Sequence, residues 1–533
     1  MFFTACNIDT APEGRVFTAD QKQKIVEANP GRLAADINGM FASPGKQYAI
    51  YGASQGRHDD AGYPTVCLSQ DLNSADMVSD NSGYNWFSTS SEYSDRSETY
   101  ANPYMRWAVF YNQIKLANDI LESIPEDTDN EQLLVYAAQA RAVRAFDYLG
   151  LAPYFQYKYK GNEDKPSVPI LTDRMEVSYT DNPRAPLSDL YAQIMADLNF
   201  AITHLEDYTR TSKGEIDISV AYGLRARANL YMENWSDAAS DADKAMQGYT
   251  PYSKSDISKP SFVNAADPSW MWAIIIQPSN VPDSYPSWPA VLSSFSGDAY
   301  STGVGCYKLI NTLLWDKIPA TDVRKGWWVD ASLTSPNLAG LTWDGATGNA
   351  IAALEISDVK EKFKPYTNVK FGQYGFIGNP INAGDWCIMR VEEMILIKAE
   401  ATAMAGDLNG GKRILTDWVQ AYRDSDYLSK AADPASFQNE VWFQRRVELW
   451  GEGFAMADVM RLGKNVVRFN SSKQGNHPED FRFNLAADNP WLLMRIPQRE
   501  TNNNLAIPPS KNNAGGAQPK AGDGAGLIDG VTE

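Results

Sequence analysis

The chain has 533 residues, of which 44% are hydrophobic and 21% are charged, enough apolar material for a large folded core. Its formal net charge is −18, from 66 acidic against 48 basic residues, which disfavours nucleic acid and anionic lipid as partners. A neutral ligand is the simpler expectation. The longest apolar runs in the sequence are far shorter than the roughly 18 residues of a membrane span.

The four cysteines stand at positions 6, 67, 306 and 387, with no CxxC pair and no zinc-type spacing, so a disulfide framework is not predicted. Cys6 differs because it follows Met-Phe-Phe-Thr-Ala, with a small residue just before cysteine as in a bacterial lipoprotein cleavage site. The basic part and most of the apolar part of a signal peptide are missing. The residues alone therefore leave two readings of Cys6 open, a free cysteine and a lipidated one.

Amphipathic helices are predicted wherever apolar residues recur every three or four positions. In chain order these segments are 19–38 with a break at Pro30-Gly31, 104–124, 131–151, 186–205, 219–246, a pair spanning 388–418 and interrupted by AGDLNGG, 435–450 and 454–462. Asp433-Pro434 supplies an N-cap and a first-turn proline for the helix at 435–450. The chain is therefore expected to be dominated by helices.

Small residues indicate how the paired helices approach one another. Ala226, Ala238 and Ala245 lie twelve and seven positions apart, and the first interval returns between Ala399 and Gly411. This spacing is typical of tetratricopeptide helix pairs, which must stack to bury their apolar faces. Because the pairs begin near 20, 104, 186 and 388, the sequence predicts a mostly α fold in which large insertions interrupt the helix-pair array.

Two long stretches lose the helical period. Residues 39–98 are rich in Gly, Ser, Asp and Asn around several aromatic residues, and their aromatic content favours a functional loop over a disordered insertion. Residues 250–385 are rich in Pro, Ser, Gly and aromatic residues, and show little helical period beyond 307–317. These insertions are where function is expected. The Gly, Ala and Asp content of 511–533 predicts a flexible tail.

Two segments resemble a known family. RVEEMILIKAEA at 390–401 and RRVELWGEGFAMADVMRLGK at 445–464 are similar to the signature of the SusD/RagB family, surface glycan-binding lipoproteins that partner TonB-dependent transporters of Gram-negative outer membranes. The charged residues that match are Arg390, Glu392, Glu400, Arg445, Arg446, Glu448, Glu452, Asp458 and Arg461. The segment ARAVRAFDYLGLAPYF at 140–155 matches again, and the C-terminal IPQRE…NNN segment matches more weakly.

The resemblance implies a SusD-like fold: a tetratricopeptide-type helix-pair scaffold with a loop-rich irregular subdomain. The expected organisation is an N-terminal lipoprotein linker (1–18), an N-terminal helical part (19–249) with a ligand loop at about 39–98, a loop-rich insertion carrying the ligand platform (250–385), a C-terminal helical part with an extended segment (386–510) and the tail (511–533). It also implies lipidation of Cys6, a lipid anchor as the only contact with the membrane, location at the outer-membrane cell surface, and a SusC-like TonB-dependent transporter as partner. Neither a cofactor nor a metal ion is expected.

The sequence lacks the common motifs of catalytic sites. The three histidines, His58, His204 and His477, show no metal-ligand spacing, and GxSxG is absent from the sequence, so a serine or zinc hydrolase is not predicted. The segment GMFASPGKQ departs from a Walker A loop in its glycine spacing and in Gln47. Carboxylate pairs such as Glu392/Glu393 and Asp59/Asp60 leave glycoside hydrolysis open, although charged surface faces explain them more simply.

The charged residues of the family signature admit a catalytic role or a structural one. Their helical context favours an ion-pair network between packed helices. Tryptophans at 107, 235, 418, 442 and 450 also lie on predicted helices, and are expected in the core.

Aromatic residues in the loops are the candidate ligand residues. A pyranose ring has an apolar C–H face and a rim of hydroxyls, so a flat ring in a solvent-exposed loop stacks on it while polar neighbours bind the rim. The candidates are Trp86 with Asn85, Trp288 with Tyr285, and then Trp327, Trp328 and Trp343. For each loop tryptophan, ligand binding and ordinary packing both remain open. The resemblance favours ligand binding by Trp86 and Trp288, because glycan-binding members of the family use an early loop and the large insertion. It indicates these regions and not the individual residues.

The function implied is non-catalytic binding of an oligosaccharide or polysaccharide for delivery to the transporter. Several loop tryptophans favour a long flat platform, and with it a β-linked plant glycan. Two alternatives stay open: a peptide-binding, RagB-like lipoprotein of a peptide importer, and a glycoside hydrolase.

Overall fold

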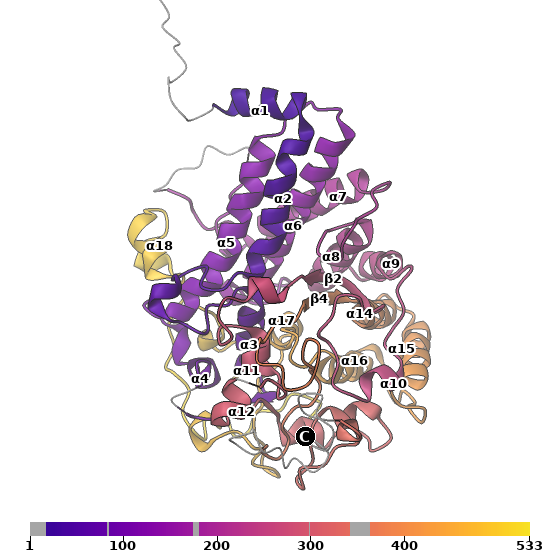
Figure 1. Cartoon of the computed structure of the whole chain (residues 1–533). Helices are drawn as coiled ribbons and strands as arrows, with labels where there is room; N and C mark the ends of the chain where they lie inside the picture. Colours follow the sequence, from indigo (N-terminus) through magenta and orange to yellow (C-terminus); the bar gives the residue numbers. More distant parts are fainter. Residues whose placement is uncertain (1–17, 83–84, 174–180, 298, 342–362) are drawn as a thin grey trace, which may run out of the picture.

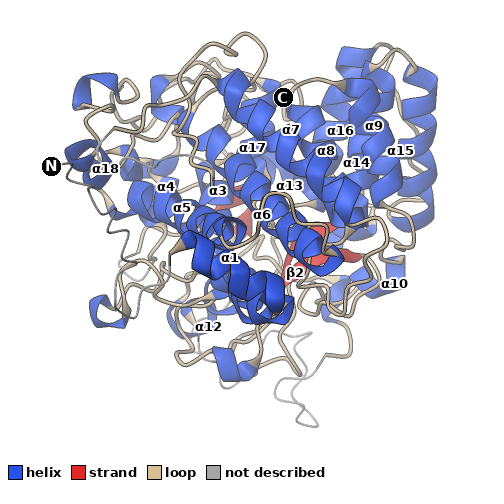
Figure 2. Ribbon diagram, turned by 90° about the horizontal axis from the view of Figure 1, so that it is seen from above, coloured by secondary structure: helices blue, strands red, loops and turns tan. Residues whose placement is uncertain are grey.

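The computed structural model describes residues 18–82, 85–173, 181–297, 299–341 and 363–533. Helices dominate these residues, and their strands form two sheets of two strands each (Figures 1 and 2). The predicted mostly α fold is confirmed. Cys6 and Trp343 lie outside the described residues.

The described helices are α1 (Ala19–Ala28), α2 (Ala34–Ala42), α3 (Tyr63–Asn73), α4 (Ser88–Ser91), α5 (Ala101–Glu122), α6 (Glu131–Phe155), α7 (Leu187–His204), α8 (Ile218–Tyr231), α9 (Trp235–Ala245), α10 (Lys254–Ile257), α11 (Trp288–Leu292), α12 (Tyr300–Val304), α13 (Thr312–Trp315), α14 (Val391–Met404), α15 (Leu408–Tyr422), α16 (Pro434–Glu448), α17 (Ala455–Leu462) and α18 (Gln498–Asn503). The strands are β1 (Met77–Val78), β2 (Trp270–Ile274), β3 (Leu309–Ile310) and β4 (Trp386–Arg390).

The scaffold helices pack as one continuous array. α5 packs on α6, α6 on α7, α7 on α8 and α8 on α9. α9 then packs on α14, although the whole loop-rich insertion separates them in sequence, and α14 packs on α15 and α16 (Figure 1). The predicted interrupted array is confirmed, because the insertion leaves the stack after α9 and the chain rejoins it at α14.

A two-stranded antiparallel sheet closes this insertion at its base. Strand β2 follows the exit from the array, and β4 leads directly into α14. Their pairing joins Trp270 to Arg390 and Ile274 to Trp386. The insertion therefore starts and ends at the same place on the scaffold.

Small residues allow the close helix contact that their spacing predicted. A Cβ atom added to Gly411 on α15 would lie 2.7 Å from the carbonyl oxygen of Ala399 and 2.7 Å from Cβ of Ala403, both on α14. Only glycine fits this approach of two backbones. The helix start at Asp433 is also confirmed, since its carboxylate accepts a hydrogen bond from the Ser436 amide at 2.9 Å.

The early insertion contains a helix that the sequence pattern did not reveal. Helix α3 lies inside 39–98, and each residue of Pro64–Asn73 is buried. Its buried residues are apolar and polar alike, including Thr65, Ser69, Gln70, Asp71 and Asn73, so no solvent-facing side marks the three-to-four period. The Asp71 carboxylate on α3 accepts hydrogen bonds from the amides of Gly453 and Ala455 at the start of α17, tying this insertion to the C-terminal helices. The helix predicted at 307–317 is likewise wrong in its first half, where β3 pairs with β1.

Buried ion pairs hold the C-terminal helices, as the structural interpretation of the family signature predicted. Glu448 on α16 accepts from Arg390 at 2.7 Å, Arg423 at 2.8 Å and Arg324 at 3.2 Å, with all four side chains at most 1% exposed. Burial alone would raise the pKa of Glu448, but the guanidinium groups of Arg423 and Arg390 hold it well below its ordinary value. Glu452 binds Arg390 as well. These charges position backbone segments rather than face solvent.

The end of the chain corrects the prediction of a flexible tail at 511–533. Asp529 is 3% exposed and pairs with Arg446 at 2.8 Å, while Arg446 also holds Asp76 at 2.6 Å. The amide of Asn484 donates to the carbonyl of Asp523 at 2.9 Å. Because the tail is polar and glycine-rich, its composition looks disordered, yet the buried arginine supplies a partner that fixes it.

Candidate functional site

Four rings from separate segments meet at the surface and form what we call the aromatic cluster: His58, Trp86, Tyr285 and Tyr300. The imidazole of His58 is stacked on the phenol of Tyr285, with 5.5 Å between centroids and 5° between planes. The Trp86 ring lies 5.3 Å from His58 and tilts by 35°. Tyr285 is 37% exposed and Trp86 is half-buried, so the cluster presents ring surface to solvent.

Tyr300 supports the cluster from below. It is 8% exposed, and its hydroxyl accepts a hydrogen bond from Trp86 Nε1 at 2.8 Å. The same hydroxyl is hydrogen-bonded to Nδ1 of His58. Burial lowers the pKa of His58, which favours the neutral imidazole. The three side chains are therefore locked in one orientation.

The loop before α4 turns Trp86 outward through its neighbours. Asn85 is 5% exposed, its amide group donates to the carbonyl of Asp80 at 2.7 Å, and its side-chain oxygen accepts from the Phe87 amide at 3.2 Å. Phe87 is buried. The expectation that Asn85 reaches a ligand is wrong, because both ends of its side chain hold the turn.

Asp283 fixes the second loop of the cluster. One carboxylate oxygen accepts from the Tyr285 amide at 3.1 Å, and the other accepts from the Tyr48 hydroxyl at 2.7 Å. Burial and this hydrogen bond to Asp283 raise the pKa of Tyr48. Tyr48 also has a φ of 55°, a conformation that costs free energy in a non-glycine residue and is often found at functional sites.

A guanidinium lies beside the rings. The Cζ atom of Arg57 is 5.8 Å from the Trp86 ring centroid and 5.4 Å from the Tyr51 centroid. Arg57 also pairs with Asp59 at 2.6 Å. The cluster thus combines apolar ring faces with hydrogen-bond donors at its edge.

Three predicted platform residues lie in the core instead. Trp288 is 2% exposed, donates to the carbonyl of Gly384 at 2.8 Å and packs 5.5 Å from Trp386. Trp327 is fully buried and donates to the carbonyl of Ile257 at 2.9 Å, and Trp328 is 1% exposed. The expectation of exposed rings at these positions is wrong. In a sequence, proline and serine around tryptophan look the same whether the ring faces solvent or packs inward.

His58 and Tyr300 were missed as members of the site. The histidines match neither a metal-ligand spacing nor a serine-hydrolase motif, and Tyr300 lies in a Gly-Asp-Ala-Tyr-Ser segment without a recognisable motif. The signal that selected Trp86 and Tyr285, an aromatic ring in a polar turn-rich loop, applies to Tyr300 too. Nothing in the sequence indicates that the four segments carrying these rings meet in the fold.

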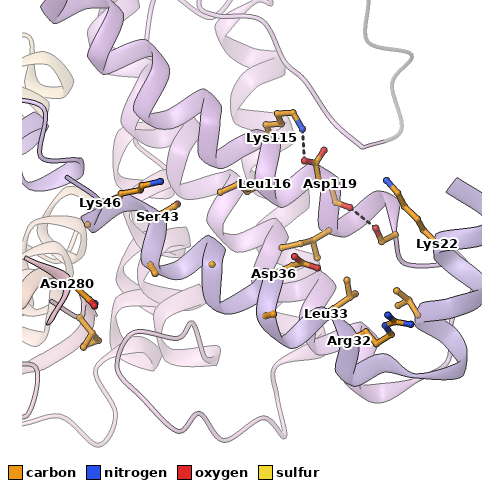
Figure 3. Close-up of a pocket in the computed structure, with 18 of the residues that line it drawn as sticks. Lys22, Arg32, Leu33, Asp36, Ser43, Lys46, Lys115, Leu116, Asp119 and Asn280 are labelled. Atoms are coloured by element: carbon orange, nitrogen blue, oxygen red, sulfur yellow. Dashed lines mark hydrogen bonds and ion pairs between the residues drawn. The ribbon is translucent and has the colours of Figure 1, made fainter. Parts of the chain in front are cut away.

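A groove of about 1130 Å³ runs beside the cluster. It is lined by α1, α2, α5 and the loop 275–282, and Figure 3 shows Lys46 and Asn280 at one end, with Lys22 and Arg32 at the other. Gln47 lines the groove and also donates to the Asp283 carbonyl at 2.8 Å. The groove therefore ends at the loop that carries Tyr285.

The lining of this groove is apolar with a cationic rim. Its charged side chains are Lys22, Arg32, Lys46 and Lys115 against Asp36 and Asp119, a net positive surface on a chain of net charge −18. Leu116 projects into it and is 38% exposed (Figure 3). Among the described residues, none of the helices meets the length and hydropathy required to cross a bilayer.

Scaffold and cluster together define a helical-repeat protein whose insertions carry half-exposed aromatic rings at the surface. Comparison with known proteins identifies the family. Residues 59–230 match a SusD-like family described as starch-binding and associating with the outer membrane, and residues 328–515 match the SusD family. The chain belongs to the SusD/RagB family.

Individual relatives are distant in sequence but similar in fold. A SusD-like protein of Formosa agariphila is 22% identical over 441 residues, covering 74% of this chain and 80% of that protein. A SusD-like carbohydrate-binding protein of Bacteroides vulgatus superposes with a TM-score of 0.71 at 22% identity, covering 89% of this chain and 96% of the other. A laminarin-binding SusD-like protein gives 0.62 at 17% identity, covering 89% and 97%.

Proposed function

We propose that this chain binds an oligosaccharide or polysaccharide at the aromatic cluster and releases it chemically unchanged. The observation that carries the proposal is the outward-facing surface of Trp86 and Tyr285, held by His58 and the buried Tyr300. Such rings stack on the C–H face of a sugar, and neighbouring donors such as Arg57 serve its hydroxyl rim. The carbohydrate-binding and laminarin-binding relatives named above support the same ligand class.

The structure does not support the predicted preference for a β-linked plant glycan. That preference depended on several exposed indoles, of which Trp288, Trp327 and Trp328 are buried. The proposal therefore names a carbohydrate and no linkage.

The carboxylate pairs that left hydrolysis open are engaged elsewhere. Glu393 binds Arg227 at 2.6 Å, Glu392 binds Arg390 at 3.0 Å, and both are at most 1% exposed. Asp60 accepts from the amides of Ile50 and Tyr51. A binding protein without turnover explains these contacts better than a glycosidase does.

Native gels cast with a panel of soluble polysaccharides test the proposal. We expect at least one polymer to retard the wild-type chain, and Trp86→Ala and Tyr285→Ala each to lose that retardation. Tyr136→Ala is the matched control, because Tyr136 is a half-exposed tyrosine on α6 and is not part of the aromatic cluster. Retardation that survives both cluster substitutions would overturn the proposal.

The two alternatives give different results with the same protein. A peptide-binding chain would leave every polysaccharide gel unchanged and produce heat with mixed oligopeptides in calorimetry. A glycosidase would release reducing sugar from the retarding polymer at a rate that follows the concentration of the purified chain.

We further propose that the chain is anchored at the outer-membrane surface through Cys6 and delivers its ligand to a SusC-like TonB-dependent transporter. The family description supports association with the outer membrane. The apolar, cationic groove of Figure 3 supports a docking face on the helical scaffold for an acidic, partly apolar segment of the transporter. Co-purification from outer membranes tests this: Leu116→Glu should reduce transporter recovery, and Leu428→Glu, at a 67% exposed position outside the groove, should not.

A further inference from the structure

The aromatic cluster continues into a second group of rings. Tyr51 lies between Arg57 and Tyr104, with its centroid 5.4 Å from Arg57 Cζ and 5.8 Å from the Tyr104 centroid. Arg499 on α18 covers the far side, with Cζ 4.3 Å from the Tyr104 centroid and 5.6 Å from that of Tyr51. Rings and guanidinium groups thus run without interruption from Tyr285 to Arg499.

Arg499 differs from Arg57 in what its donors contact. Arg57 is paired with Asp59, whereas the exposed guanidinium of Arg499 has no ion pair and no hydrogen bond to any described residue. Its Cζ atom lies 4.3 Å from the Tyr104 ring centroid, and none of its five N–H donors has a partner among the described residues. Arginine fixed in this way is arranged to receive two oxygens of one anionic group.

The nearby carboxylates have partners of their own. Asp283 accepts from Tyr48 and from the Tyr285 amide, and Asp60 accepts from backbone amides. Glu500, next to Arg499 in sequence, accepts from the Asn504 side chain at 2.7 Å. Among the described residues, the Arg499 guanidinium therefore keeps unpartnered donors, while each of these carboxylates already accepts at least one hydrogen bond.

The net charge of −18 does not forbid an anionic ligand here. At physiological salt, exposed charges are screened beyond about 8 Å, so the groups next to Arg499 decide the local field. The neighbours that touch its guanidinium are tyrosine rings, which attract a cation and carry no charge of their own.

We propose that Tyr51, Tyr104 and Arg499 form a second subsite that selects carbohydrates bearing anionic oxygen groups, either uronic carboxylates or sulfate esters. This inference rests on the proposed carbohydrate binding and deepens it. Tyr104 and Tyr51 provide the stacking surface, Arg499 binds the anionic group, and Arg57 joins this subsite to the aromatic cluster. A ligand spanning both subsites is an oligosaccharide rather than a single sugar.

Affinity gels with three polymers separate the possibilities: alginate carries carboxylates, carrageenan carries sulfate esters, and laminarin is neutral. We expect Arg499→Gln to weaken binding to alginate, carrageenan or both by roughly tenfold or more, and to leave laminarin unchanged. Arg499→Lys keeps the positive charge but lacks the planar set of guanidinium donors, so its binding to the anionic polymer should lie between that of Arg499→Gln and that of the wild type. Arg413→Gln, at an exposed arginine on α15, is the control and should change nothing.

Salt gives an independent readout. Added sodium chloride should weaken wild-type binding to the anionic polymer more steeply than binding to laminarin, and Arg499→Gln should remove most of that difference. Equal effects of Arg499→Gln on all three polymers, or no effect on any, would overturn the subsite. Retardation of the wild type by laminarin alone would also overturn it while leaving the proposed function standing, whereas no retardation by any polysaccharide would remove both.

Discussion

The imidazole of His58 lies parallel to the phenol ring of Tyr285, with 5.5 Å between ring centroids and 5° between ring planes. His58 comes from the early insertion and Tyr285 from the large one. The aromatic cluster therefore belongs to neither insertion alone. The scaffold positions it by holding both insertions at fixed places.

Tyr285 and Trp288, three residues apart, should respond in opposite ways to substitution. Tyr285 is 37% exposed, so Tyr285→Ala should alter the free energy of unfolding by no more than about 0.5 kcal/mol while abolishing ligand retardation. Trp288 is 2% exposed and hydrogen-bonded to Gly384, so Trp288→Ala should cost about 3–5 kcal/mol. Urea unfolding measures the stability of each variant, and the affinity gels measure its ligand binding. Equal stability losses would show that Tyr285 is part of the core.

The Glu448 ion pairs should be essential for stability. Glu448→Gln leaves Arg390, Arg423 and Arg324 buried without their shared carboxylate, and we expect a loss of about 3–5 kcal/mol in the free energy of unfolding. The control is Asp119→Asn, which breaks the exposed pair with Lys115 and should cost at most about 1 kcal/mol. Similar losses for both variants in denaturant titrations would contradict a special role for the buried network.

Two helical glycines should respond oppositely to alanine. At Gly411, a new Cβ meets the Ala399 carbonyl oxygen at 2.7 Å, and α14 and α15 must separate, at a cost of about 1–3 kcal/mol. At Gly39 on α2, nothing lies within 4 Å of the new Cβ, so Gly39→Ala should stabilise by about 0.5–1 kcal/mol through helix propensity. Thermal unfolding of the two variants measures both effects. A Gly411→Ala variant more stable than the wild type would contradict the close approach of α14 and α15.

Asp147 on α6 should make stability depend on pH. It is fully buried, neither carboxylate oxygen has a hydrogen-bond partner among the described residues, and burial raises its pKa well above the ordinary value. Above the unfolded pKa of about 3.9, the folded chain keeps a proton that the unfolded chain loses. The free energy of unfolding should therefore fall as pH rises, by about 1.4 kcal/mol per pH unit for this group, until the folded pKa is reached.

Asp147→Asn removes this titration while keeping the shape of the side chain. The variant should gain stability over the wild type as pH rises from about 5 to about 7, and the two should converge near about pH 4. Urea titrations at these three pH values measure the difference in the free energy of unfolding between variant and wild type. The other carboxylates are the same in both chains, so their contributions cancel in this difference. Parallel pH profiles would show that Asp147 ionises normally in the folded chain.

Local patterns predicted the helices well wherever one helix face met solvent. α15 shows this, as does α16, whose start at Asp433 follows from its capping chemistry. The same patterns failed at α3, because its polar residues are buried together with its apolar ones and no solvent-facing side marks its period. They failed again at the tail, where the partner of Asp529 is an arginine distant in sequence.

The candidate site was predicted only in part. Trp86 and Tyr285 were selected correctly as half-exposed or exposed rings, whereas Trp327 and Trp328, in an equally polar loop, are buried. Which ring of a turn-rich loop faces solvent depends on what packs beneath it. Trp328 packs on Trp450, with 5.4 Å between the ring centroids. Trp450 is distant in sequence, so the residues around Trp328 give no sign of this contact.

The amino-acid sequence by itself determined the helix-pair scaffold, its small-residue contacts and the charged signature, because each follows from spacing within one segment. The tertiary structure alone decided which aromatic rings gather at the surface. His58, Trp86, Tyr285 and Tyr300 acquire a common orientation only when two insertions meet on the folded scaffold, and burial on the opposite side of each loop selects which rings remain exposed.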